Sequence, residues 1–194
     1  MSGFKFTNSD QEAPGELPTE FSITASTSTD IWVKPPDTKR FNAPILHKTF
    51  SLSSFAKARV SVSANWKDLY DQGGLILVVP QKDGTKHWVK TGIEFYKGQA
   101  MASTVSSTDN GSDWSLLPIP GGGSSVTIEM VKEDGSLWIY IIEGVRHVPI
   151  REVTWILADA ENKGDCWLGA FAAKPSNEGG KLKVTFAHLL IETS

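Results

Sequence analysis

Apolar and polar residues alternate along most of the chain with a period of two. The alternation is clear in residues 59–64, 126–130 and 181–186, where every second side chain is apolar. Because successive side chains of a β-strand point to opposite faces, each segment is predicted to be a strand with one buried and one exposed face. Residues 75–79 and 138–142 are apolar throughout, which is typical of strands covered on both faces.

Short clusters of turn residues separate these segments. Glu133-Asp134-Gly135-Ser136 lies between two strand segments and predicts a β-hairpin, because Asp and Gly tolerate the positive φ angles of tight turns. Helix is predicted to be minor, with single turns at 65–70 and 153–160. Many short strands in one chain favour an all-β fold, built as a sandwich of two antiparallel sheets.

Length and composition fit one globular domain. The chain has 194 residues, of which 40% are hydrophobic, enough to bury a core. We therefore expect a single domain over residues 1–194, with residues 1–20 as an extended lead-in. The net charge of −3 and the lack of a basic stripe argue against nucleic acid or an anionic membrane as a partner.

Other sequence features narrow the cellular context and the chemistry. No apolar run approaches the roughly 18 residues of a spanning helix, and the N-terminus lacks the apolar region of a signal peptide, so we expect a cytoplasmic protein. Cys166 is the only cysteine, which excludes an intrachain disulfide and a cysteine-based zinc site. We expect no metal and no cofactor.

The segment from His87 to Tyr96 carries the clearest candidate chemistry. As a strand it would turn one face to the core and present the other face as Trp88, Lys90, Gly92, Glu94 and Tyr96. At about 3.3 Å per residue, Lys90 and Glu94 stand about 13 Å apart along the strand, too far for a direct ion pair. Two aromatics, two charges and a gap at glycine suit a polar small molecule. The alternative is a solvated outer face.

Other polar and aromatic side chains cluster in the same way. Asp30 and Trp32 would share one strand face, and Tyr70 and Gln72 come just before a buried strand. Asp113 and Trp114 repeat the pairing of an acid with an indole. The candidate ligand-binding set is therefore Asp30, Trp32, Tyr70, Gln72, Trp88, Lys90, Glu94, Asp113 and Trp114.

Five motifs in a fixed order carry a resemblance to a known family. They are Thr29-Asp30-Ile31-Trp32, Tyr70-Asp71-Gln72-Gly73-Gly74-Leu75, Trp88-Val89-Lys90-Thr91-Gly92-Ile93-Glu94, Ser112-Asp113-Trp114-Ser115 and Leu168-Gly169-Ala170-Phe171-Ala172-Ala173-Lys174-Pro175. From about residue 21 to 191 the chain resembles the DUF1349 family, which includes the fungal regulation-of-enolase proteins. Lys174 stands where a small residue is expected, a minor departure on a loop.

The resemblance implies a concanavalin A-like jelly roll whose concave sheet face is the usual ligand groove. It also implies an intracellular regulatory or metabolic role, although no residue predicts a contact with enolase. Glucanases of the wider superfamily cluster their acids on one strand, whereas Glu94 stands alone, and a retaining mechanism needs two carboxyls about 5–5.5 Å apart. The acidic turn at 109–113 falls short of the six to eight ligands that calcium takes.

Three hypotheses follow for function. The first is a lectin-like binding module that holds a carbohydrate or another small polar metabolite on the concave sheet. The second is an enzyme of the isomerase, cyclase or lyase type, acting on a small biosynthetic intermediate with Glu94 and Lys90 as the acid/base pair, because burial shifts both pKa values. The third is a protein–protein adaptor with Trp88 in an exposed aromatic patch. The sequence leaves the oligomeric state open.

Overall fold

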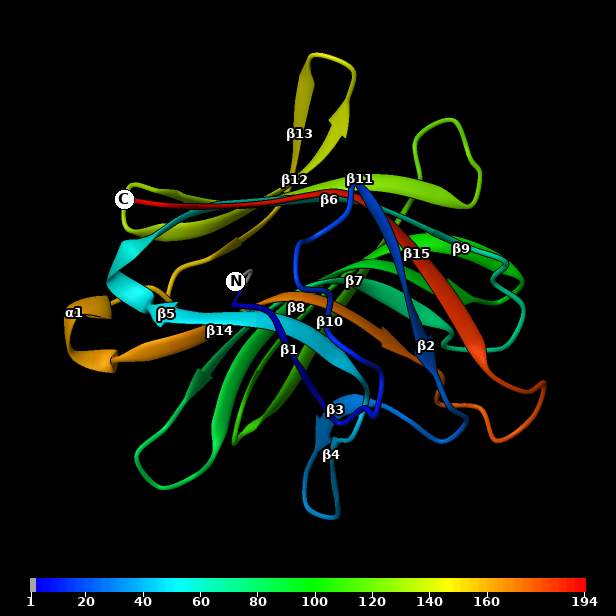
Figure 1. Cartoon of the computed structure of the whole chain (residues 1–194), viewed down its shortest axis with the longest axis horizontal. Helices are drawn as coiled ribbons and strands as arrows, with labels where there is room; N and C mark the ends of the chain where they lie inside the picture. Colours follow the sequence, from blue (N-terminus) through cyan, green and yellow to red (C-terminus); the bar gives the residue numbers. More distant parts are fainter. Residues whose placement is uncertain (1–2) are drawn as a thin grey trace.

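The computed structural model describes residues 3–194, and these form two large antiparallel sheets packed face to face (Figure 1). The seven-stranded sheet has the order β1 (Lys5–Thr7), β5 (Ile45–Ser51), β14 (Asp165–Ala173), β7 (Gln72–Pro80), β8 (Lys86–Tyr96), β9 (Gln99–Thr108), β10 (Gly111–Pro118). The six-stranded sheet has the order β13 (Arg146–Val153), β12 (Ser136–Glu143), β11 (Ser125–Glu133), β6 (Phe55–Ala64), β15 (Leu182–Thr193), β2 (Glu20–Ala25). The expected all-β sandwich is confirmed.

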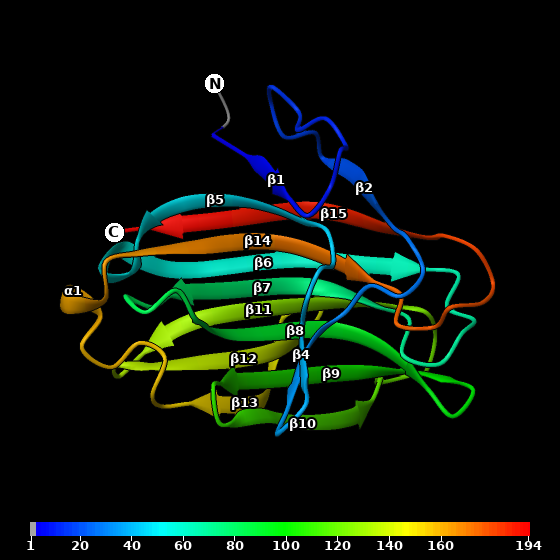
Figure 2. The same ribbon diagram turned by 90° about the horizontal axis from the view of Figure 1, so that it is seen from below.

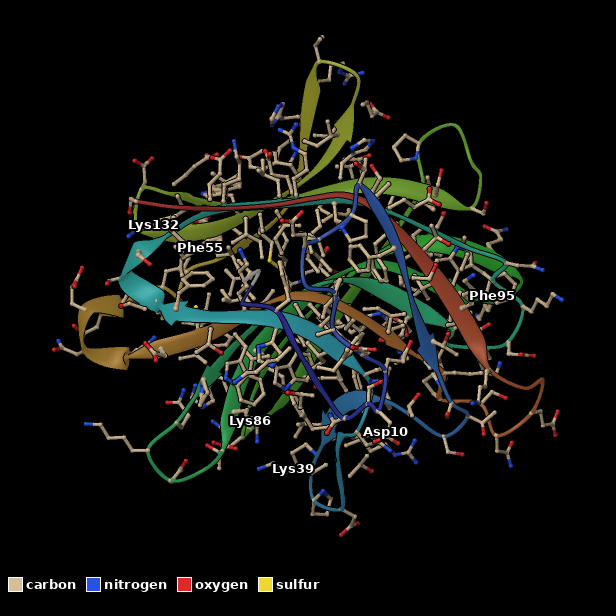
Figure 3. All side chains as sticks on the ribbon, viewed as in Figure 1. Asp10, Lys39, Phe55, Lys86, Phe95 and Lys132 are labelled. Atoms are coloured by element: carbon tan, nitrogen blue, oxygen red, sulfur yellow. The ribbon has the colours of Figure 1, made fainter. Side chains whose placement is uncertain are left out.

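The main core fills the space between the two sheets. Alternation decides which side chains enter it: Val60 and Val62 from β6 meet Leu75 and Leu77 from β7, and all four are buried. Figure 3 shows Phe55 in the layer between the sheets. Removing such a side chain costs about 3–5 kcal/mol, so this layer supplies much of the stability.

A third, smaller layer covers the outer face of the seven-stranded sheet. It is the hairpin of β3 (Ile31–Lys34) and β4 (Thr38–Phe41), which crosses in front of β8, β9 and β10 in Figure 2. A second apolar cluster joins the hairpin to the sheet and includes Ile31, Ile76 and Trp88. Residues 75–79 are therefore covered on both faces, as expected.

The β11–β12 turn forms as the sequence predicts. Asp134 and Gly135 have φ angles of 47° and 80°, and Glu133 pairs with Ser136 across the turn. The two predicted helical turns are misplaced. Residues 65–70 form an irregular segment that ends in a turn, and residues 154–159 form bends and a turn. Within residues 3–194, the α-helix α1 spans Ala160–Lys163 and a 3-10 turn, η1, spans Leu52–Ser54. None of the helices in residues 3–194 is long and apolar enough to cross a membrane.

The structure differs from the sequence-based expectation in the burial of residues 138–142 and in the conformation of the N-terminal lead-in. Trp138 and Tyr140 stack on each other on the outer face of the six-stranded sheet and are only half-buried, so the segment 138–142 is covered on one face alone. The extended lead-in is anchored: β1 pairs with β5, and the Asn8 amide donates to the Phe41 carbonyl at 3.0 Å.

The β12–β13 ribbon projects from the sandwich (Figure 1).

Candidate functional site

A pocket lies between the β3–β4 hairpin and the outer face of the seven-stranded sheet. Its volume of about 330 Å³ is at the lower end of the range for small-molecule sites. Its lining residues come from the hairpin and the residue before it, from three strands of the sheet and from two loops. They are Asp30, Trp32, Lys34, Thr38, Arg40, Tyr70, Gln72, Lys90, Glu94, Trp114 and Pro175.

The two faces of the hairpin meet two different environments. Residues directly opposite in an antiparallel pair share a face, and the register pairs Trp32 with Arg40 and Lys34 with Thr38. These four side chains line the pocket. On the opposite face, Ile31 and Val33 belong to the apolar cluster around Trp88, and Phe41 packs against it. The hairpin therefore separates a dry cluster from a polar pocket.

Paired glycines let β7 and β8 approach closely beneath the pocket. Gly74 lies opposite Gly92, and a Cβ added at Gly92 would stand 2.1 Å from the Gly73 carbonyl oxygen. On either side of this pair the register places Gln72 opposite Glu94 and Ile76 opposite Lys90. The Lys90 side chain spans the glycine pair, because its Nζ donates to Gln72 Oε1 at 2.5 Å. Gly92 thus leaves room for the lysine.

Lys90 is almost fully buried, and its hydrogen-bond partners are neutral. Its Nζ donates to the Ile31 carbonyl at 2.7 Å as well as to Gln72, and it lies 5.6 Å from the ring centre of Trp88. Burial lowers the pKa of Lys90, although the nearby Asp30 and Glu94 oppose the shift. The fold holds this amine in place without a carboxylate in direct contact.

Glu94 is also buried, and one hydroxyl orients it. Ser103 Oγ donates to Glu94 Oε2 at 2.8 Å and accepts from Trp114 Nε1 at 3.2 Å. Burial raises the pKa of Glu94, and the Lys90 charge and the Ser103 hydrogen bond oppose that shift. Glu94 therefore has an increased tendency to be neutral, and a neutral carboxyl can donate as well as accept a hydrogen bond.

Aromatic rings form one wall of the pocket around Trp114. Its ring centre lies 6.3 Å from that of Trp32, 6.1 Å from Tyr70 and 5.4 Å from Tyr96, all in edge-to-face geometry. These distances lie in the favourable range for aromatic pairs, so the rings hold one another in position.

A buried ion pair holds the loop that presents Tyr70. Lys174 is 1% exposed, and its Nζ contacts Asp68 and lies 3.2 Å from Asp71 Oδ1. Burial opposes the charge of Lys174, but the two carboxylates outweigh it and raise the pKa of this amine. Lys174 was expected to be a minor departure on a loop, but its side chain is buried and joins the Tyr70 loop to the segment of Pro175 on the opposite rim.

The structure brings seven of the nine candidate ligand-binding residues to this pocket and leaves two outside it. Trp88 is 1% exposed beneath the hairpin, which excludes it from the pocket wall and from the exposed patch of the adaptor hypothesis. Asp113 points from the other face of β10 and pairs with Arg151 at 3.0 Å. Adjacent strand residues face opposite ways, so Asp113 and Trp114 cannot both line the site.

Four lining residues were absent from the candidate set: Lys34, Thr38, Arg40 and Pro175. A local signal existed for Lys34, because it stands two residues after Trp32 and so shares its strand face. In the acidic turn at 109–113, the Asp109 carboxylate forms an ion pair with Lys39, at 3.2 Å. Within residues 3–194, no group of three or more His, Cys, Asp or Glu side chains is arranged to hold a metal ion.

Residues 6–194 match the family described as "Protein of unknown function (DUF1349)". The chain belongs to this family. An uncharacterised protein of Emericella nidulans is 52% identical over 197 residues, which cover 100% of this chain and 98% of the relative. "Regulation of enolase protein 1" of Saccharomyces cerevisiae is 34% identical over 130 residues, covering 67% of this chain and 60% of that protein.

Solved structures confirm the jelly-roll fold. A functionally unknown protein from Saccharomyces cerevisiae superposes with a TM-score of 0.79 and 27% identity, covering 100% of this chain and 97% of that one. A mutant of the GH43 protein BlXynB from Bacillus licheniformis gives a TM-score of 0.64 at 13% identity, with 92% of this chain covering 34% of that chain. A pseudo β-1,3-glucanase of Mycobacterium tuberculosis gives 0.59 at 10% identity, covering 100% and 92%. At such low identity the last two likenesses show the fold alone.

Proposed function

We propose that this protein is a lectin-like binding module that holds a carbohydrate or another small polar metabolite in the hairpin pocket. The observation that carries the proposal is the meeting of an aromatic wall around Trp114 with two buried ionisable groups, Lys90 and Glu94, in one cavity. An aromatic ring provides a flat surface for the C–H face of a sugar, while buried polar groups fix its hydroxyls.

The size and polarity of the pocket support a small hydroxylated ligand. A cavity of about 330 Å³ suits one or two sugar rings better than a long chain. The name of the yeast relative supports a regulatory role in metabolism as part of the proposal. The cytoplasmic location stays a prediction.

Calorimetric titration with a panel of neutral and charged monosaccharides and disaccharides tests the proposal. At least one member should bind, and Trp114→Ala should weaken that binding about tenfold or more, since stacking on an aromatic ring contributes on the order of 1–3 kcal/mol. Trp138→Ala is the matched control, because Trp138 stacks with Tyr140 on the outer face of the other sheet. Silence of the folded wild-type protein across the panel would contradict the proposal.

A second candidate function is acid/base catalysis on a small molecule of the same pocket. The observation that favours it is the raised pKa of Glu94, which burial produces and which brings a carboxyl closer to the range useful for proton transfer. Lys90, with its lowered pKa, would be the second group. Glu94→Gln should abolish turnover of such a substrate while leaving its binding largely intact. An unchanged rate in this variant would exclude Glu94 as the acid/base.

A further inference from the structure

Two cationic side chains line the pocket without a partner in the described protein. Lys34 of β3 and Arg40 of β4 are both exposed, and no hydrogen bond or ion pair within residues 3–194 engages either side chain. The neighbouring Lys39 behaves differently. It lies on the opposite face of β4 and pairs with Asp109 at 3.2 Å. The pocket face of the hairpin therefore carries the unpaired positive charge.

The register allows the two cations to act on one group. Lys34 lies opposite Thr38, so Arg40, two residues further along β4, is its diagonal neighbour on the same face. Diagonal neighbours in an antiparallel pair have Cβ atoms about 7–8 Å apart, a span that two long side chains close easily. An ammonium and a guanidinium at this spacing can converge on one phosphate or carboxylate.

The acids of the pocket do not neutralise these cations. Glu94 is 6% exposed and accepts from Ser103, and Asp30 is 8% exposed and accepts from the Ile31 amide at 2.8 Å. Both therefore lie buried in the floor, where their charges interact with the buried Lys90. Asp37 stands on the β3–β4 turn and is not part of the lining. The hairpin rim of the pocket therefore carries positively charged side chains, whereas the floor carries both acidic and basic side chains.

We infer that the ligand is a polyhydroxylated small molecule that bears one anionic group, a phosphate or a carboxylate. The anionic group lies between Lys34 and Arg40 at the rim, and the hydroxylated ring lies against Trp114 above Lys90 and Glu94. This inference rests on the proposed function and deepens it, because it excludes neutral sugars as the preferred ligands of the same pocket.

Calorimetric titration of the full chain with three matched probes tests the inference. The probes are glucose, glucose 6-phosphate and glucuronate, which share one ring and differ in the anionic group. At least one anionic probe should bind about tenfold or more tightly than glucose at low salt, since charge-assisted hydrogen bonds are the stronger kind. The preference should shrink as the salt concentration rises, because ions screen exposed charges. Which anionic probe binds better distinguishes a phosphate from a carboxylate.

Paired variants assign the effect to the rim. Lys34→Gln with Arg40→Gln should reduce the preference for the anionic probe over glucose to about twofold or less. Lys181→Gln with Lys183→Gln is the control of equal charge change, because both lysines are exposed near or on β15, in the other sheet. This control should keep the full preference.

The outcomes separate the two proposals. Equal affinity for all three probes, lost in Trp114→Ala, would overturn the anionic ligand and leave the binding module standing. A preference that survives the Lys34→Gln/Arg40→Gln change would also overturn the assignment to the rim. Absence of binding by all three probes and by the wider panel would overturn both proposals together.

Discussion

Two buried lysines differ in what surrounds their charge. Lys174 lies between Asp68 and Asp71, outside the pocket lining, and these carboxylates raise its pKa. Lys90 is equally inaccessible, yet its Nζ contacts a carbonyl and an amide oxygen, and burial lowers its pKa. The fold neutralises the first charge with its own acids and leaves the second amine facing a cavity.

This difference indicates which buried lysine stabilises the fold and which one is available to bind a ligand. An ion pair closed by two carboxylates holds segments together and has no remaining need of a partner. A buried amine whose two hydrogen-bond partners are neutral still gains from an added acceptor, because burying a charge is costly unless it is paired and hydrogen-bonded. We therefore propose that Lys174 is a structural residue and that Lys90 is a binding residue.

The largest expected effect is the loss of the Lys174 ion pair. Lys174→Met should lower the free energy of unfolding by about 3–5 kcal/mol, because it leaves the buried Asp71 carboxylate without its cation. Urea denaturation measures this change. Lys183→Met, a matched change on an exposed strand position, should stay within about 0.5 kcal/mol of the wild type. Equal stability of Lys174→Met and the wild type would remove the distinction between the two lysines.

The second effect concerns Lys90. Lys90→Met should lower the free energy of unfolding by about 1–3 kcal/mol, less than Lys174→Met, because it leaves two neutral acceptors, the Ile31 carbonyl and Gln72 Oε1, without their donor. The same variant should weaken binding of the sugar ligand about tenfold or more. Urea denaturation and calorimetry on the same preparation measure both. A strongly destabilised variant that still binds would show that Lys90, like Lys174, is structural.

A smaller effect is expected at Ser103. Ser103→Ala removes the hydroxyl that donates to Glu94 and accepts from Trp114, at a cost of about 1 kcal/mol in the free energy of unfolding. Because this hydrogen bond favours the charged carboxylate, its loss should raise the pKa of Glu94 further. Carbon-13 NMR of the glutamate carboxyl across pH 3–9 follows that titration. A lower pKa in the variant would contradict the arrangement.

The smallest expected effect is a difference in pH dependence caused by Glu94. Its pKa in the folded protein lies above the unfolded value, so the stability that its proton contributes is present at low pH and is lost as the pH rises through the folded pKa. Glu94→Gln does not titrate. Its free energy of unfolding should therefore improve relative to the wild type between pH 4 and pH 7, measured by urea denaturation. A relative loss over that range would mean that the pKa is not raised.

The faces of the strands could be predicted from the sequence, because the alternation of side chains is a local property. The row Trp88, Lys90 and Glu94 emerged from spacing alone, and the structure keeps all three on one face of β8. Local spacing does not say what covers a face. The hairpin of residues 31–41 arrives from a distant part of the chain and buries Trp88, while Lys90 and Glu94 remain beside a cavity.

Long-range packing also explains why other residues differ from the sequence-based expectations. Lys174 looks like a loop lysine until the fold brings Asp68 and Asp71 against it from about 100 residues away. Alternation from Leu182 through Val184 and Phe186 predicts that His188 lies on the same buried face of β15. However, the β15–β6 register shifts between Ala187 and Leu190, and His188 has a φ of 56° and an exposed side chain. A bulge reverses the faces of a strand, and period-two reasoning cannot locate it.

The most direct test follows the two lysines at once. Protein labelled with carbon-13 at the lysine side chains is titrated with glucose 6-phosphate or glucuronate at neutral pH, and the Cε resonances of Lys90 and Lys174 are recorded. The Lys90 resonance should move with saturating behaviour while that of Lys174 stays fixed. A fixed Lys90 resonance in protein that calorimetry shows to be saturated, or equal movement of both resonances, would contradict the assignment of Lys90 to the ligand.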